Sequence, residues 1–241
     1  MDILYKLPFP QEVCSKIFMY TCKSPHTGLG VAILKKIIGL PIYNKLIECG
    51  CINADRNVIK ITNITLTSSQ DNQLTFDIGH LKSLPKLSEI WLSNTGVSGN
   101  IVHLKSLLNL TKVALGGTGV SGNIAHLKSL PNLTDIRLYN TGVTGNIEHL
   151  NSLSKLTHID LENTGVTGNI ESLKSLLNLT WIQFDNTCVT GNIEHLKSLP
   201  KLTEIHLYNT GVTGNIEHLK LLPNLTGIYL VSTGVTGTSS T

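Results

Sequence analysis

The chain has 241 residues, 15% of them charged, and a formal net charge of +3 at pH 7. This length allows one repeat array or one to two ordinary domains, and so mild a charge does not indicate nucleic acid or a membrane surface as a partner. No apolar run approaches the roughly 20 residues that would span a bilayer. The function therefore has to be inferred from motifs rather than from bulk composition.

The first residues, "MDILYKLPFPQEVCSK", contain neither a long apolar segment nor a small-residue cleavage site. We therefore expect no secretory signal and a cytoplasmic location, with the nucleus as the alternative. Five cysteines form an odd set, concentrated in the first quarter of the chain: Cys14, Cys22, Cys49, Cys51 and Cys188. Without a signal they are expected to be reduced thiols. The "CGC" at 49–51 is too closely spaced for the usual zinc site.

Residues 1–60 predict a small helical unit. A proline at an expected helix start is followed by Val13, Ile17 and Tyr20 along one face. Two more apolar stretches, "GVAILKKIIG" and "PIYNKLIEC", are bounded by Gly and Pro and are also expected to be helical. Such a unit would cover the exposed apolar edge of a repeat array, so we predict a helical N-terminal cap before an array over 61–241.

The start of this segment also carries a short motif. The pattern P-x-E-[LIV]-x-x-x-I-F is matched by Pro10, Glu12, Val13, Ile17 and Phe18. It resembles the core that opens F-box domains, although Phe9 stands where Leu is usual and the Trp-containing second half is missing. The resemblance implies docking of a Skp-type adaptor of a cullin ubiquitin ligase, with the repeats holding a substrate. We prefer the cap alone, because any solenoid needs one, and keep the F-box substrate receptor as an alternative.

The rest of the sequence is periodic. The twelve residues "YNTGVTGNIEHL" occur at 139–150 and again at 208–219, and 208 − 139 = 69, which is three times 23. A column of leucines runs from Leu104 to Leu219 at this period. A column of isoleucines does the same: Ile78, Ile101, Ile124, Ile147, Ile170, Ile193 and Ile216. A fixed period in the twenties is typical of a solenoid.

Each unit contains a strand and a return. In "LTEIHLYNTGV" at 202–212 the apolar residues alternate, which predicts a short strand with apolar side chains facing inward. In "TGNIEHLKSLPK" they lie three apart, which suits a 3₁₀ or short helical return. Stacking one strand and one return per turn would give a parallel sheet about 34 Å long. We expect eight strands, centred near Thr65, Trp91, Ala114, Arg137, Asp160, Gln183, His206 and Tyr229.

The unit resembles the leucine-rich repeat, and more narrowly the plant-type unit LxxLxLxxNxLxGxIPxxLxxL. The resemblance implies an α/β solenoid, a right-handed horseshoe of about seven to eight units with the parallel sheet on its concave face. This unit is one residue shorter and lacks the Pro after the Ile of "GNI". Thr replaces the family's Asn at Thr95, Thr118, Thr141, Thr164, Thr187, Thr210 and Thr233. We expect its hydroxyl to bond backbone groups in the turn and the preceding Asn to face solvent.

Comparison of the repeats with one another separates scaffold from variable positions. The variable positions lie in the strand, where alternation places them on the outward, concave side. Both tryptophans and three of the six tyrosines are among them. Exposed aromatic residues are typical anchors of a binding surface. We predict these contact residues: Glu89, Trp91, Arg137, Tyr139, His158, Asp160, Trp181, Gln183, Asp185, His206, Tyr208 and Tyr229.

These strand columns are acidic, whereas the return carries a row of lysines. Six acidic residues stand there against two basic ones: Glu89, Asp135, Asp160, Glu162, Asp185 and Glu204 against Lys112 and Arg137. A protein partner with a basic patch is the expected complement. Harmless drift between copies is the alternative explanation, but drift would rarely collect the aromatic residues on one face. We therefore predict a non-enzymatic protein-binding module.

Two patterns could indicate other chemistry. A histidine column is broken by Ser172: His80, His103, His126, His149, His195 and His218. Without co-ligands in zinc-site spacing we expect a surface row and no metal. His158 with Asp160, and His206 near Asp185, could pass for acid–base pairs. Because no Ser or Cys nucleophile and no pocket is evident, we expect no catalytic residue and no cofactor.

The N-x-T pattern, which marks glycosylation acceptors in secreted chains, occurs at Asn63, Asn109, Asn132, Asn178 and Asn224. Four of these are the repeated "NLT" just before a strand, so we interpret them as repeat sequence. A secreted, glycosylated recognition protein of the plant-receptor kind remains the alternative.

Overall fold

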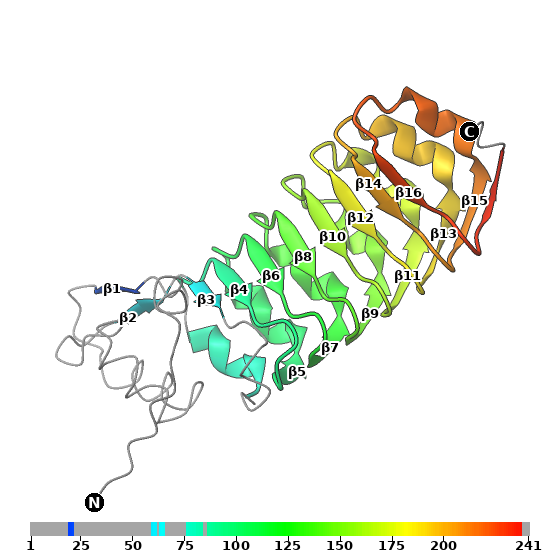
Figure 1. The fold of residues 1–241 in the computed structure, drawn as a ribbon. Coiled ribbons are helices and arrows are strands. Elements are labelled where there is room, and N and C mark those ends of the chain that lie inside the picture. Colours follow the sequence, from blue (N-terminus) through cyan, green and yellow to red (C-terminus); the bar gives the residue numbers. More distant parts are fainter. Residues whose placement is uncertain (1–18, 22–58, 62, 66–75, 84–85, 238–241) are drawn as a thin grey trace, which may run out of the picture.

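The structure is a computed structural model that describes residues 19–21, 59–61, 63–65, 76–83 and 86–237. The array is an elongated solenoid (Figure 1). Each complete coil contributes one strand to a first sheet, one strand to a second sheet and one short 3₁₀ helix. We call the first of these the front sheet and the second the side sheet.

The front sheet has eight parallel strands in the order β16-β14-β12-β10-β8-β6-β4-β3, which confirms the predicted number and positions. Their bounds are β3 (Asn63–Thr65), β4 (Glu89–Trp91), β6 (Lys112–Ala114), β8 (Asp135–Arg137), β10 (His158–Asp160), β12 (Trp181–Gln183), β14 (Glu204–His206) and β16 (Gly227–Tyr229). The central residue of a strand is buried and the two flanking residues face outward, as in β10 and β12.

The side sheet has seven parallel strands. They are β5 (Ser98–Asn100), β7 (Gly119–Asn123), β9 (Gly142–Asn146), β11 (Gly165–Asn169), β13 (Cys188–Asn192), β15 (Gly211–Asn215) and β17 (Gly234–Thr236). The prediction of one strand per turn is therefore wrong. In "GVTGN" only the valine is buried, so the segment lacks the apolar alternation that identifies a strand in sequence.

The two sheets differ in register. In the front sheet His158 lies opposite Trp181, and 181 − 158 = 23, one full repeat. In the side sheet Thr167 lies opposite Cys188, and 188 − 167 = 21, so each strand is staggered by two residues. A shift of two leaves every side chain on the same face of a sheet. Both sheets therefore present the same kinds of side chain from coil to coil.

The returns are 3₁₀ helices, as predicted. Their bounds are η1 (Ile78–Ser83), η2 (Ile101–Ser106), η3 (Ile124–Ser129), η4 (Ile147–Leu150), η5 (Ile170–Ser175), η6 (Ile193–Ser198) and η7 (Ile216–Leu221). From η2 onward an Asn caps each start, as where Asn146 accepts a hydrogen bond of 2.8 Å from the amide of Glu148. The cap satisfies an amide that the short helix leaves without a partner.

The core is built from the repeat columns. Ile124, Leu127 and Ile136 have no exposed surface, and neither do their equivalents in the other central coils. Burial of each such side chain contributes about 1.5–3 kcal/mol. This core holds the short front strands in place and so fixes the positions of their outward side chains.

The turn between the two strands of a coil follows the prediction for Thr. Thr164 Oγ1 donates to the carbonyl oxygen of Leu161 at 2.6 Å, a bond that stays within its own coil. The preceding Asn163 is exposed, as predicted, and has a φ of 51°. Its side-chain amide donates to Asn140 Oδ1 of the previous coil at 2.8 Å. The ladder between coils is therefore formed by this Asn and not by the Thr.

Most of the predicted N-terminal cap lies outside the described residues, including the F-box-like motif at 10–18. The described part shows β1 (Met19–Thr21) paired antiparallel with β2 (Ile59–Ile61). The helix predicted to reach Tyr20 is therefore wrong at these three residues. None of the helices in the described ranges has the length and apolarity needed to cross a bilayer.

Candidate functional site

Nine of the twelve predicted contact residues lie in the front strands, and the other three, Tyr139, Asp185 and Tyr208, lie just beyond them. Together they do not form one continuous surface. They separate into a cluster around Trp91, an aromatic row at β12 to β16, and a hollow between these two. Tyr139 stands apart, where its ring covers Gly116 and its hydroxyl accepts a hydrogen bond of 3.3 Å from Asn94. Tyr208, which is 42% exposed, lies at the side of the sheet towards the turns.

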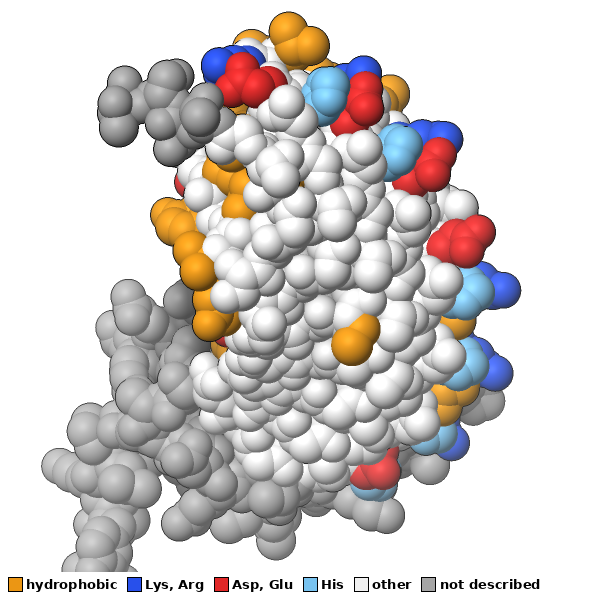
Figure 2. Space-filling view, turned by 90° about the vertical axis from the view of Figure 1, so that its right-hand side faces the viewer, with side chains coloured by type: hydrophobic (Ala, Val, Ile, Leu, Met, Phe, Trp, Pro, Cys, Tyr) orange, Lys and Arg blue, Asp and Glu red, His pale blue; other side chains and the backbone are white. Residues whose placement is uncertain are grey.

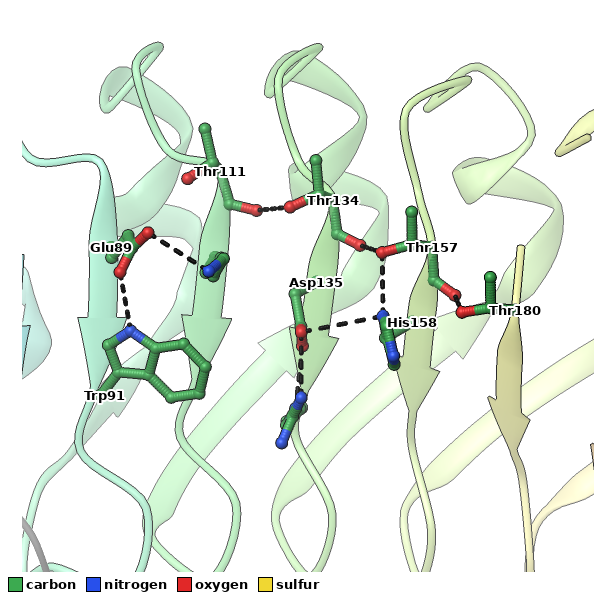
Figure 3. Close-up of polar contacts among 10 residues, drawn as sticks. Glu89, Trp91, Thr111, Thr134, Asp135, Thr157, His158 and Thr180 are labelled. Carbon is green, nitrogen blue, oxygen red and sulfur yellow. Dashed lines mark hydrogen bonds and ion pairs between the residues drawn. The ribbon is translucent and has the colours of Figure 1, made fainter. Parts of the chain in front are cut away.

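The cluster around Trp91 is internally paired (Figure 3). The indole Nε1 of Trp91 donates to Glu89 at 3.0 Å, and Lys112 forms an ion pair with the same Glu89 at 3.4 Å. The Lys112 ammonium and the Arg137 guanidinium each lie 5.5 Å from the Trp91 ring centroid. The predicted anchor Trp91 is therefore already contacted by two cations of its own chain, which lowers its availability to a partner.

Arg137 is held by a carboxylate on its own strand. Its Nε and Nη2 donate to the two oxygens of Asp135 at 2.9 and 3.0 Å. The hydrogen bond to Asp135 is the largest cause that raises the pKa of Arg137. His158 Nδ1 lies 4.0 Å from the same carboxylate and 2.8 Å from the hydroxyl of Thr157. These contacts fix the orientation of the His158 ring between Asp135 and Thr157.

A threonine ladder runs beside these residues (Figure 3). Thr134, Thr157 and Thr180 each donate their hydroxyl to the backbone carbonyl of the equivalent threonine one coil earlier, at 2.8–3.0 Å. Sequence reasoning missed this ladder, although the repeated "LT" was its signal. The ladder ties neighbouring front strands together directly beside the variable residues.

The aromatic row consists of Trp181, His206 and Tyr229 on three successive strands. The rings of Trp181 and His206 are stacked with centroids 4.9 Å apart, and those of His206 and Tyr229 with centroids 4.3 Å apart. His206 Nε2 is buried without a hydrogen bond and lies 3.6 Å from a Glu204 oxygen. Tyr229 is 53% exposed. Stacked and partly exposed aromatic rings are typical of surfaces that anchor a partner.

Three carboxylates lie next to the row: Asp160, Glu162 and Asp185. Burial raises the pKa of Asp160 to about 6, and the neighbouring charges of Glu162 and Asp185 add to the effect, whereas the Glu162 amide and Arg137 oppose it. Burial also raises the pKa of Asp185. Asp185 accepts a hydrogen bond of 2.6 Å from the backbone amide of Tyr208, and Glu162 accepts one of 2.8 Å from Gln183. Glu162 therefore belongs to the site. Sequence analysis had placed it among the acidic residues of the strand columns but not among the contact residues.

A hollow of about 270 Å³ lies between the Trp91 cluster and the aromatic row. Its lining residues are Arg137, His158, Asp160, Trp181 and Gln183, all of which were predicted contact residues. They come from three adjacent strands, β8, β10 and β12. The expectation that an open sheet would offer no pocket is therefore wrong.

The histidine column lies on the 3₁₀ returns, where it alternates with acidic and basic residues. His195 lies 3.8 Å from Glu171, and His218 lies 3.9 Å from Glu194. Glu171 and Glu194 also pair with Lys174 and Lys197, and these hydrogen bonds are the largest cause that lowers their pKa values. Within the described ranges there is no group of three or more His, Cys, Asp or Glu side chains that could hold a metal ion.

The side sheet presents a different surface (Figure 2). Its exposed positions are occupied by small uncharged residues in successive coils, as at Ser121, Thr144, Thr167, Thr190 and Thr213. The capping asparagines flank this hydroxyl row, and Cys188 replaces one glycine. The charged and histidine side chains of the returns gather along one margin of this face and leave its centre free of charge.

Neither a protein-family model nor a curated protein matches the sequence. Solved structures do match. Internalin C2 from Listeria monocytogenes aligns over 88% of this chain and 87% of its own, at 22% identity and a TM-score of 0.64. The Arabidopsis receptor kinase HAESA, in complex with the peptide hormone IDA and the co-receptor SERK1, aligns over 67% of this chain at 26% identity and a TM-score of 0.61.

The repeat unit, the two parallel sheets and these structures agree. The fold is a leucine-rich-repeat solenoid. The structure of a plant ice-binding protein also aligns with this chain, over 88% of this chain and 81% of its own, at 18% identity and a TM-score of 0.65. This chain spans 28% of the HAESA chain, so that likeness concerns the repeats alone.

Proposed function

We propose that this leucine-rich-repeat chain is a non-enzymatic module that binds a protein or peptide partner on its front sheet. The observation that carries the proposal is the stacked row of Trp181, His206 and Tyr229, flanked by carboxylates, at the variable positions of a scaffold that otherwise repeats. The HAESA structure, which includes a peptide hormone, supports a peptide as the class of ligand. Because the core fixes the outward side chains before binding, little conformational entropy would be lost.

The test is selection of binders from a random peptide display library on the immobilised protein. We expect enriched peptides to lose affinity about 30-fold or more for the Trp181→Ala/Tyr229→Ala variant, because truncation of a buried aromatic anchor costs about 2 kcal/mol or more. The control is Thr144→Ala/Thr167→Ala on the side sheet, which should bind like the wild type. Failure to enrich any peptide, or equal affinity for both variants, would reject the front sheet as the binding face.

A second candidate function rests on the side sheet, which we propose could bind ice. Its hydroxyl row has one member per coil, and parallel strands repeat at roughly 4.8 Å. An ice surface is uncharged and periodic. Charged side chains would retain their hydration shells and so weaken contact with it. The uncharged centre of this face meets that requirement, and the similarity to a plant ice-binding protein supports it.

This second function is tested by partition of fluorescently labelled protein into a slowly growing ice hemisphere. We expect the wild type to enter the ice and the Thr167→Lys/Thr190→Lys variant to be excluded from it. Ser106→Lys/Ser154→Lys adds the same charge outside the side sheet and should partition like the wild type. Exclusion of the wild type, or equal partition of both lysine variants, would reject ice as the ligand.

A further inference from the structure

The hollow beside Trp181 has an aromatic wall with a free face. The indole of Trp181 is stacked on His206 on one side, at an interplanar angle of 22°. The same ring lines the hollow together with Asp160 and Gln183. His206 covers one side of the ring, so an occupant of the hollow would contact the other side, which faces β10 and its His158.

The charges around the hollow are unbalanced. Within the described ranges Asp160, Glu162 and Asp185 form no ion pair with a lysine or an arginine. The charge of Arg137 acts on Asp160, but both of its hydrogen bonds go to Asp135. Asp160 lines the hollow together with Arg137 and His158. The charges of Glu162 and Asp185 act on Asp160 from beside the hollow, so carboxylates outnumber the one arginine. Burial disfavours the ionised forms of Asp160 and Asp185, as their raised pKa values show, and a cation would relieve that cost.

The size of the hollow excludes a large ligand. Sites for drug-sized molecules and cofactors occupy about 300–1,000 Å³, whereas this hollow measures about 270 Å³ and is open to solvent. One long side chain of a partner fits such a volume. An anionic side chain would be repelled by Asp160 on the wall and by Glu162 and Asp185 beside it, and a purely apolar one would add no counter-charge to that of Arg137.

We infer that this hollow receives an arginine side chain of the partner, with its guanidinium stacked on the free face of Trp181 and hydrogen-bonded to the carboxylate of Asp160. A guanidinium can do both, because it is planar and carries parallel N–H donors, whereas an ammonium group presents a compact charge without a face. The side-chain oxygen of Gln183 is a further acceptor, since its Nε2 already donates to Glu162. This inference rests on the proposed function of the front sheet and names the chemistry of its partner.

The two tryptophans of the chain make the test direct. In a ¹H–¹⁵N correlation spectrum each gives one indole cross-peak, and the Trp91→Phe variant identifies which is which. N-acetyl-arginine amide is titrated to about 50 mM, a range that detects millimolar affinity. We expect it to shift the Trp181 cross-peak and not the Trp91 cross-peak. N-acetyl-lysine amide should bind about tenfold more weakly, and the uncharged N-acetyl-citrulline amide should leave the peak in place.

Two variants complete the test. Asp160→Asn keeps the shape and should lower the arginine affinity about tenfold or more, whereas Glu171→Gln on the returns should leave it unchanged. A citrulline shift equal to that of arginine, an unaffected Asp160→Asn variant, or no shift at all would overturn the inference. If library peptides still bind through Trp181 and Tyr229 in that case, the front-sheet function stands and only the arginine assignment fails. If no peptide binds either, both fail.

Discussion

At the scale of single residues, Asp160 carries a charge that burial makes unfavourable. Burial, first of all, raises its pKa from 3.8 to about 6, so the folded chain holds this proton more tightly than the unfolded chain does. Its contribution to stability is therefore greatest below pH 4 and is lost as the pH rises through 6. The shift corresponds to at most about 3 kcal/mol, and partial exposure reduces this to about 1–2 kcal/mol. We expect Asp160→Asn to raise the unfolding free energy by that amount at pH 7.5, with a gain that shrinks towards pH 4, as measured by urea unfolding.

Glu171 provides a control of opposite sign. Its hydrogen bond to Lys174 is the largest cause that lowers its pKa, so its contribution to stability is present at neutral pH and is lost in acid. Glu171→Gln should therefore lower stability slightly at pH 7.5 and have no effect in acid. An Asp160→Asn variant that follows the trend of Glu171→Gln would contradict the assigned environment of Asp160.

The "NLT" pattern shows how far single residues can be interpreted from sequence. In the structure the side-chain amide of Asn132 donates to the carbonyl oxygen of Leu108 at 3.1 Å, and Thr134 donates to Thr111 at 3.0 Å. Both polar residues of the motif thus hydrogen-bond to the preceding coil. This supports its interpretation as repeat sequence, and the periodicity alone had suggested as much. The partners of these bonds could not be predicted, because they depend on the register between coils.

At the scale of elements, two glycines of one side strand behave differently. Gly145 in β9 has a φ of 114°, and a Cβ there would collide with the side-chain oxygen of Asn123, the cap of η3. Gly142 in the same strand has no positive φ, and a Cβ there would lie 3.2 Å from that of Ser121. We expect Gly145→Ala to cost about 2 kcal/mol or more and Gly142→Ala less than about 1 kcal/mol, measured by urea unfolding. Equal costs would show that the cap can move aside.

The strands of the side sheet could not be predicted from the sequence, whereas the other elements of a coil could. The front strands and the 3₁₀ returns were predicted because their apolar residues repeat at spacings of two and three. The five-residue side strands have one buried valine each, as in β11. Their remaining residues are glycine, serine, threonine and asparagine, with a cysteine in β13. Their strand conformation follows from pairing between coils, as where Thr167 pairs with Cys188. Such tertiary pairing leaves no periodic signal within one unit.

For the molecule as a whole, the outward positions of the front strands were easier to predict than the contacts between their side chains. Period 23 predicted which strand residues face outward, as at Asp160 and Gln183. It could not show that Trp91 is flanked by Lys112 and Arg137, or that Trp181 stacks on His206. These contacts depend on side-chain directions across strands, which alternate burial does not determine. The sequence therefore predicted one continuous surface, whereas the structure shows a separate hollow and aromatic row.

The solenoid also predicts how stability is distributed along the array. Each coil contacts only its neighbours, so a coil with a neighbour on both sides is held more strongly than one with a single neighbour. Ile182 and Ile205 have no exposed surface, whereas the equivalent Ile228 in β16 is 36% exposed. We expect amides of β16 to exchange with solvent at least about 100-fold faster than those of β8 and β10, which corresponds to about 2.7 kcal/mol. Hydrogen exchange followed by mass spectrometry would measure the gradient. Uniform protection from β8 to β16 would mean that the array unfolds as a single cooperative unit, and the aromatic row would then be as rigid at Tyr229 as at Trp181.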